Sequence, residues 1–179
     1  IATLFPYTTL FRSLSNSHIK KYIVNAPLKV NTRNETKDYK SNTMALAPLV
    51  CNDSQILILG TLPGQESLKA QQYYNNKRNR FWKILASLFN EQLPNNYHEK
   101  IELLKRHNIA LWDVLHSAQR EGSIDLNITD EVPNDLNEFL NQYPNIRIIA
   151  LNGSNAYKMF VQNFGNTTSK VRIIKLFKY

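Results

Sequence analysis

A polar and aromatic stretch from Gly60 to Trp82 carries most of the side chains suited to chemistry. Its start, Gly60–Gly64, forces a tight turn whose backbone N–H groups can hold a developing negative charge, as an oxyanion hole does. Tyr73 and Tyr74 offer aromatic faces for stacking. Asn79 carries an amide, which is a poor base but can orient a water molecule. Each feature also has a structural explanation: a turn, aromatic packing and a helix cap, respectively.

These side chains are expected at one edge of a parallel sheet. The turn follows an apolar run, Ile56–Leu59, that is typical of a buried strand. Asp113 follows a second such run and Asn152 a third. Because parallel sheets bind ligands at the carboxyl ends of their strands, Gly60, Asp113 and Asn152 should lie near one site. An N-cap for a short helix starting at Val114 explains Asp113 equally well, and an ordinary turn is the stronger explanation for Asn152.

Strand and helix patterns alternate along the chain. Apolar periodicity predicts strands over 55–59, 109–112, 145–151 and 171–176, and helices over 79–89, 95–106, 134–142 and 154–164. Residues 121–133 are predicted to be mostly loop, and Asn108 and Gly165 are predicted to stop helices. This alternation predicts an α/β protein, a three-layer α/β/α sandwich around a central, mostly parallel four-stranded sheet.

Composition narrows the class of protein. The chain has 179 residues, which suits one domain with a sizeable core, and its apolar runs are too short to span a bilayer. A single cysteine excludes a disulfide framework and a four-cysteine metal or iron–sulfur site. The histidines lack metal-ligand spacing, and His116 is expected on a surface helix. We therefore expect no metal, no cofactor, a monomer and a reducing, cytoplasmic setting.

Net charge gives only weak evidence for a nucleic-acid partner. Of the net +8, residues 1–43 hold 7 Lys+Arg and 2 Asp+Glu, which leaves +3 for residues 44–179. Placement matters more, because Arg78, Arg80 and Lys83 cluster beside the candidate site. They either bind phosphates or are solvated charges at a helix start.

The first 43 residues do not fit a domain. Residues 1–13 resemble translated sequencing-adapter sequence, and residues 14–43 are polar and lack a clear period. We expect residues 1–43 to be a non-native or disordered extension and residues 44–179 to form the domain, with Met44 as the natural start.

Three sequence blocks resemble the uracil-DNA glycosylase superfamily, and its hypoxanthine-DNA glycosylase (DNA-deoxyinosine glycosylase) branch in particular. The first block is a strand followed by GTLPG-x-x-SL, then YY and N-x-FW, within Gly60–Trp82. The second joins Ala110–Val114 to Arg120–Asp125, and the third, weaker block is Ile148–Gly153. The resemblance covers about residues 50 to 176.

The resemblance implies the fold predicted above and a monofunctional DNA glycosylase of base excision repair, which hydrolyses the bond between sugar and a deaminated base, hypoxanthine or uracil. It implies that Asn79 is the catalytic residue and that Tyr74 stacks on the base. Asp113 aligns with an Asn that reads the uracil edge in relatives. The implied base-binding set is Gly60, Thr61, Leu62, Pro63, Tyr74, Asp113 and Asn152, and the implied DNA-binding set is Arg78, Arg80 and Lys83.

The chain departs from the family in two places. Asn76-Lys77 stands where the family usually has His-Pro, which removes a constraint on the loop before Asn79. The family also continues past its fourth strand into a motif resembling LPSTSP, and we expect this chain, which ends at Tyr179, to be truncated before it. Two alternatives stay open: a catalytically impaired nucleic-acid-binding module, and an α/β hydrolase or phosphate binder for small molecules that uses the Gly60 turn.

Overall fold

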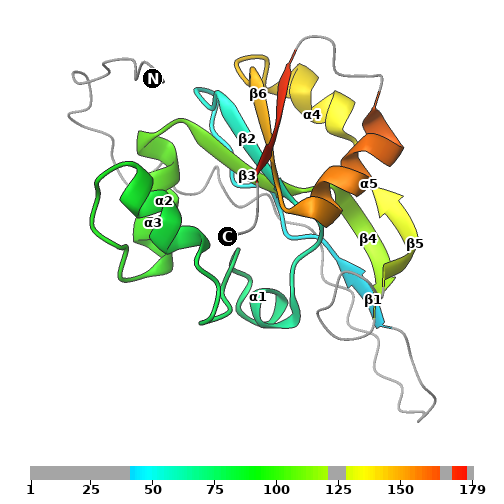
Figure 1. Cartoon of the computed structure of the whole chain (residues 1–179), viewed down its shortest axis with the longest axis horizontal. Coiled ribbons are helices and arrows are strands. Elements are labelled where there is room, and N and C mark those ends of the chain that lie inside the picture. The colour runs from blue at the N-terminus through cyan, green and yellow to red at the C-terminus, as the bar shows by residue number, and fades with distance from the viewer. Residues whose placement is uncertain (1–40, 121–127, 166–170, 177–179) are drawn as a thin grey trace.

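The predicted parallel sheet forms the centre of the molecule. A computed structural model of the chain describes residues 41–120, 128–165 and 171–176 (Figure 1). Its four-stranded sheet has the order β3-β2-β6-β7, and every neighbouring pair is parallel. The strands are β2 (Ile56–Gly60), β3 (Ile109–Asp113), β6 (Ile148–Asn152) and β7 (Arg172–Leu176). This confirms the strands predicted from the apolar runs, with small shifts at their ends.

Helices cover both faces of this sheet, which confirms the predicted three layers. α2 (Phe81–Leu88) and α3 (Tyr97–Arg106) lie on one side, and α4 (Leu136–Gln142) and α5 (Ser154–Phe164) lie on the other (Figure 1). Side chains alternate along β2 and so contribute to two cores. Leu57 and Leu59 pack in the cluster that includes Phe160 of α5, whereas Ile58 packs with Trp82 and Leu103.

A second sheet was not predicted. β1 (Ser41–Met44), β4 (Leu115–Arg120) and β5 (Ile128–Pro133) form an antiparallel sheet in the order β1-β4-β5, on the lower right of Figure 1. The loop predicted over 121–133 is therefore wrong for 128–133, while 121–127 lie outside the described residues. The helix considered at Val114 is wrong as well, and His116 is an exposed strand residue, not a helical one.

The N-terminal strand moves the start of the folded part. β1 pairs with β4 from Ser41↔Arg120 to Met44↔Ser117, and Thr43 is buried. Three residues of the extension predicted over 1–43 thus belong to a sheet, and residues 1–40 lie outside the described residues. That Met44 is the natural start stays a hypothesis.

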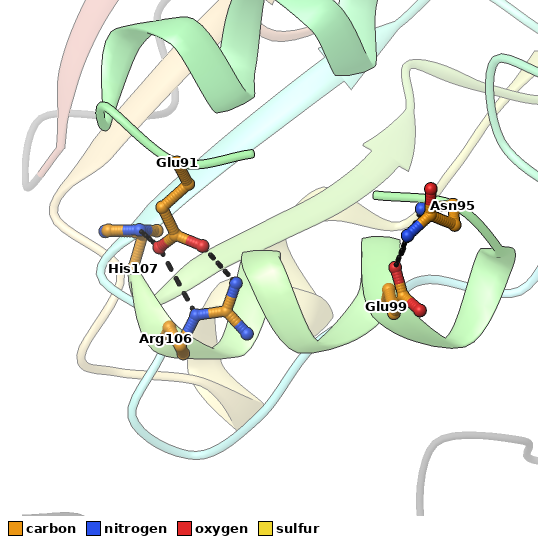
Figure 2. Close-up of polar contacts among 5 residues, drawn as sticks. All are labelled: Glu91, Asn95, Glu99, Arg106 and His107. Carbon is orange, nitrogen blue, oxygen red and sulfur yellow. Dashed lines mark hydrogen bonds and ion pairs between the residues drawn. The ribbon is translucent and has the colours of Figure 1, made fainter. Parts of the chain in front are cut away.

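Particular residues set both ends of α3 and the end of α5. Asn96 caps α3 by accepting a hydrogen bond from the Glu99 N–H at 2.9 Å. The Glu99 carboxylate accepts from the Asn95 N–H at 2.7 Å and from Asn95 Nδ2 at 3.3 Å, and Figure 2 shows these two residues in contact. Asn108 has the left-handed φ of 53° that was predicted for it after α3. Gly165 follows the last residue of α5 and has a right-handed φ of −48°, which confirms that the helix ends at this glycine.

Candidate active site

Four of the predicted residues meet at the carboxyl edge of the parallel sheet. Gly60 and Asp113 are register partners at the ends of β2 and β3, and Asn152 ends β6 on the other side of β2. A Cβ atom on Gly60 would lie 2.6 Å from Asp113 Oδ1 and 3.3 Å from the Tyr74 hydroxyl oxygen. Asn152 Nδ2 donates a hydrogen bond of 2.9 Å to that hydroxyl. A larger residue at position 60 would therefore force the Asp113 carboxylate, and to a lesser degree the Tyr74 phenol, to shift.

Asp113 is a buried carboxylate in this cluster. Its residue is 4% exposed, and its backbone carbonyl accepts a 2.8 Å hydrogen bond from Asn134 Nδ2. The same amide donates to the Leu115 carbonyl at 3.1 Å, and the Asn134 N–H donates to the Val114 carbonyl at 3.0 Å. Asn134 therefore fixes the bend between β3 and β4 that carries Asp113. This role could not be predicted from the sequence, because an Asn before a helix is indistinguishable from an ordinary cap.

Tyr74 is held in place through its ring. It adopts a left-handed φ of 53°, and its ring stacks on Phe81 with centroids 4.0 Å apart and planes at 20°. The Phe81 ring meets Trp82 edge-on at 5.0 Å, and Trp82 Nε1 donates to the Tyr73 carbonyl at 3.0 Å. The start of α2 thus positions the tyrosine, and the Asn152 amide orients its hydroxyl.

Tyr73 belongs to the core and not to the surface of the site. Its hydroxyl donates to the carbonyls of Leu46 and Ala47 at 3.2 Å each, and its N–H donates to the Tyr97 hydroxyl at 3.1 Å. Burial, followed by the nearby Asp113 carboxylate, raises the pKa of Tyr73 well above 10.0. Of the two tyrosines considered for stacking, the structure places only Tyr74 beside Gly60.

The turn after β2 is tied by its carbonyl groups to the segment that follows β3. The Gly60 carbonyl accepts from Val114 N–H at 2.9 Å, and the Thr61 carbonyl accepts from Leu115 N–H at 3.2 Å. The next two carbonyls, those of Leu62 and Pro63, accept from the guanidinium of Arg120. Arg120 is fully buried at the end of β4. Its contact with a turn 57 and 58 residues away in the chain was not predicted.

Asn79 lies exposed at the entry to α2. Its Oδ1 accepts a hydrogen bond from the Phe81 N–H at 2.9 Å, but Arg80 occupies the N-cap position of α2, so the prediction that Asn79 caps this helix is wrong by one residue. Its N–H donates to the Asn76 carbonyl at 2.8 Å, and Asn76 Oδ1 accepts from the Arg78 N–H at 2.8 Å. These bonds constrain the loop in which the expected proline is absent. Through Phe81, Asn79 is linked to the ring of Tyr74.

Basic side chains surround Asn79. Lys77, Arg78, Arg80 and Lys83 are all exposed along the loop and the first turn of α2. Within residues 41–120, 128–165 and 171–176, no group of three or more His, Cys, Asp or Glu side chains could hold a metal ion. No helix in the same part of the chain is long and apolar enough to cross a membrane.

Comparison with known proteins agrees with this architecture. The family model of the Uracil DNA glycosylase superfamily matches residues 47–178. A hypoxanthine DNA glycosylase of Methanosarcina barkeri is 38% identical over 124 residues, which are 68% of this chain and 78% of the relative. One of Methanosarcina acetivorans is 40% identical over 119 residues, 65% of this chain and 75% of the relative.

A solved structure gives the same result. The solution NMR structure of a candidate uracil DNA glycosylase from Methanosarcina acetivorans superposes with a TM-score of 0.65 and 33% sequence identity, covering 77% of this chain and 84% of the other. The residues matched by the family model include the turn after β2 and the ends of β3 and β6. This chain belongs to the uracil-DNA glycosylase superfamily.

Proposed function

We propose that the chain is a monofunctional DNA glycosylase that removes hypoxanthine, and also uracil, from DNA. The observation that carries the proposal is the buried Asp113 carboxylate packed against Gly60 beside the Tyr74 hydroxyl, at the carboxyl edge of the sheet. It occurs in a chain that is 38% and 40% identical to two hypoxanthine DNA glycosylases. A base flipped out of the DNA stack would be held at this edge.

Asp113 accounts for a preference for deaminated bases. An ionised carboxylate only accepts hydrogen bonds. Hypoxanthine N1–H and uracil N3–H are donors, whereas adenine N1 is an acceptor and would face Asp113 unfavourably. Tyr74 supplies an aromatic ring whose position is fixed by Phe81 and Asn152. Asp113, Tyr74 and Asn152 together form the base-binding set, with the backbone of Gly60–Pro63 beside them.

Asn79 would orient the attacking water. The bond between C1′ and the base nitrogen breaks, the electron pair leaves on the base, and water adds to the oxocarbenium-like sugar carbon. The proton that this water loses balances the proton that the base anion takes up. A sugar cation needs little nucleophilic push, so an amide that orients water suffices. The Asn79 side-chain oxygen has two lone pairs, and the hydrogen bond from the Phe81 N–H uses only one of them.

The test measures alkali-labile abasic sites in matched oligonucleotides that carry inosine, uracil, adenine or cytosine at one position. We expect product from inosine and from uracil, and a loss of roughly 10²-fold or more in Asn79→Ala, because the water loses its orientation. Asn96→Ala is the matched control, since the Asn96 side chain also accepts a backbone N–H at the start of a helix, in this case α3. Asn96→Ala should lose about 1 kcal/mol of stability with its cap, and Asn79→Ala about as much with its hydrogen bond to the Phe81 N–H.

The outcomes separate the proposal from its rival. Full activity in Asn79→Ala would remove Asn79 from the reaction. Equal losses of activity in Asn79→Ala and Asn96→Ala would show that stability alone is responsible. DNA binding without base release in the unaltered chain would identify a nucleic-acid-binding module instead, and release from free nucleosides alone would identify a small-molecule hydrolase.

A further inference from the structure

The turn after β2 directs a run of carbonyl groups to one side. The carbonyls of Gly60 and Thr61 bond to the backbone of Val114 and Leu115. Those of Leu62 and Pro63 bond to the buried Arg120 guanidinium. The segment 114–120 therefore binds every carbonyl from Gly60 to Pro63. The Arg120 side chain, and not the backbone of β4, binds the last two of these carbonyls, those of Leu62 and Pro63.

The direction of a carbonyl fixes the direction of the next N–H. The described residues contain no cis peptide bond, and in a trans peptide the C=O and the following N–H point in opposite directions. The N–H groups of Thr61, Leu62 and Gly64 thus point away from the 114–120 segment. Arg120 binds the carbonyls of Leu62 and Pro63, and the residues that follow them are Pro63 and Gly64. Since Pro63 has no N–H, Arg120 fixes the direction of one N–H group, that of Gly64.

We propose that Arg120 is a positioning residue that aims the Gly64 N–H at the departing base, where this donor stabilises the negative charge that the base acquires. This inference rests on the proposed glycosylase function and extends it to a residue outside the base-binding set. Arg120 touches no substrate; it acts through the Pro63–Gly64 peptide.

Electrostatics favours such an arrangement. The electron pair of the broken C1′–N bond leaves on the base, and a base bound on the side of the turn that bears the N–H groups would develop its negative charge beside these donors. An arginine stays protonated at every working pH, and a guanidinium that binds a carbonyl polarises the same peptide and strengthens its N–H as a donor. Donors fixed in advance where charge develops are among the largest contributors to catalysis.

A purely structural role for Arg120, in joining β4 to the turn, makes a different prediction. Loss of a structural link reduces cleavage of every substrate by the same factor. Loss of charge stabilisation reduces cleavage most for the base that leaves least readily. The comparison therefore needs two bases of the same shape, and hypoxanthine and 8-azahypoxanthine qualify because the extra ring nitrogen makes the departing anion more stable.

The experiment measures single-turnover cleavage of both bases by the unaltered chain, Arg120→Gln and Arg120→Lys. We expect the cleavage rate of Arg120→Gln to fall on the order of 10²-fold for hypoxanthine, as when an oxyanion donor is removed, and to fall clearly less for 8-azahypoxanthine. Arg120→Lys keeps the positive charge, so its cleavage rate for hypoxanthine should lie between those of the unaltered chain and Arg120→Gln. Asn134→Ser is the matched control, because Asn134 links β3 to β4 through the carbonyls of Asp113 and Leu115 and does not bind those of Leu62 and Pro63. Its cleavage rate should fall by the same factor for both bases.

Equal losses on both bases in the Arg120 variants would overturn the inference and leave the glycosylase proposal standing. No cleavage of either base by the unaltered chain would overturn both. Because a buried arginine can be needed for folding, a second measurement uses the unaltered chain alone. Free hypoxanthine added to the ¹⁵N-labelled protein should shift the Gly64 amide proton downfield, and an unmoved Gly64 resonance at saturation contradicts the inference.

Discussion

At the scale of the residue, adding one Cβ atom to Gly60 would disturb two residues of the candidate site. A Cβ there would lie 2.6 Å from Asp113 Oδ1 and 3.3 Å from the Tyr74 hydroxyl oxygen. Gly60→Ala must therefore displace the buried carboxylate, the phenol or both. We expect a loss of about 1–3 kcal/mol in stability from overpacking, and base release reduced by more than this loss explains. Thermal unfolding and single-turnover cleavage on inosine DNA measure the two effects.

Gly153→Ala is the control for this prediction. Gly153 has a φ of 109°, which strains any other residue, yet a Cβ there would meet no atom within 4 Å. This variant should lose about 1 kcal/mol through backbone strain and keep its rate of cleavage once folded. If Gly60→Ala behaved like Gly153→Ala, the close approach of Asp113 and Tyr74 would have no role in activity.

The residues of the site divide into those that local patterns predict and those that they do not. Gly60, Asp113 and Asn152 were found because each follows an apolar run, and strand ends converge at one edge of a parallel sheet. Arg120 and Asn134 were missed because both act on backbone carbonyls of distant segments. Nothing in their own neighbourhood distinguishes them from a surface arginine or a cap.

At the scale of the element, the parallel sheet was predictable and the antiparallel sheet was not. Strands covered on both faces must be nearly all apolar, as β2 and β3 are. β5 buries only Ile128 and exposes its other five residues, so it lacks alternation. β4 mixes Leu115 and Ala118 with four polar residues, and its buried Arg120 is the reverse of what a strand pattern requires.

A charged cluster links two elements on the α2/α3 side of the sheet. The Glu91 carboxylate, which follows α2, accepts from Arg106 at the end of α3 and lies 2.6 Å from His107 Nε2 (Figure 2). The His107 ring stacks on Phe89 at 3.6 Å. The hydrogen bond from Arg106 is the main reason that the pKa of Glu91 lies below its ordinary value of 4.5.

This lowered pKa predicts an acid-dependent loss of stability. A carboxyl whose pKa is lower in the folded state stabilises the fold above its ordinary pKa, and that contribution disappears as the pH falls through the folded value. Glu91→Gln should therefore cost about 0.5 kcal/mol at pH 7 and flatten the pH dependence below pH 4.5. Urea unfolding between pH 7 and pH 3 measures it. Glu102→Gln is the control, because it breaks only the pair with Lys105 inside α3; an identical pH profile for both variants would exclude the cluster as the cause.

At the scale of the whole molecule, the candidate site lies where the parallel sheet, the loop before α2 and the antiparallel sheet meet. The parallel sheet supplies Gly60, Asp113 and Asn152, and the loop before α2 supplies Tyr74 and Asn79. The antiparallel sheet supplies Arg120 from behind the turn. Each sheet alone leaves the candidate site incomplete, so base release should require both, although of the two sheets only the parallel one carries residues expected to touch the base.

Charge is also distributed unevenly over the molecule, and this predicts how salt weakens DNA binding. Residues 44–179 carry a net charge of only +3, yet Arg80 and Lys83 lie exposed beside Asn79. If each binds one phosphate, the double variant Arg80→Ala/Lys83→Ala should lower the slope of log K against log salt by about 2, since each contact releases roughly 0.9 counterion. Lys158→Ala, exposed on α5 on the opposite face of the sheet, should leave the slope unchanged. Fluorescence anisotropy at several salt concentrations gives both slopes, and equal slopes in all three proteins would mean that the phosphates bind elsewhere.

Because phosphate contacts position DNA without reading its sequence, the ratio of inosine to adenine cleavage should not change in either variant.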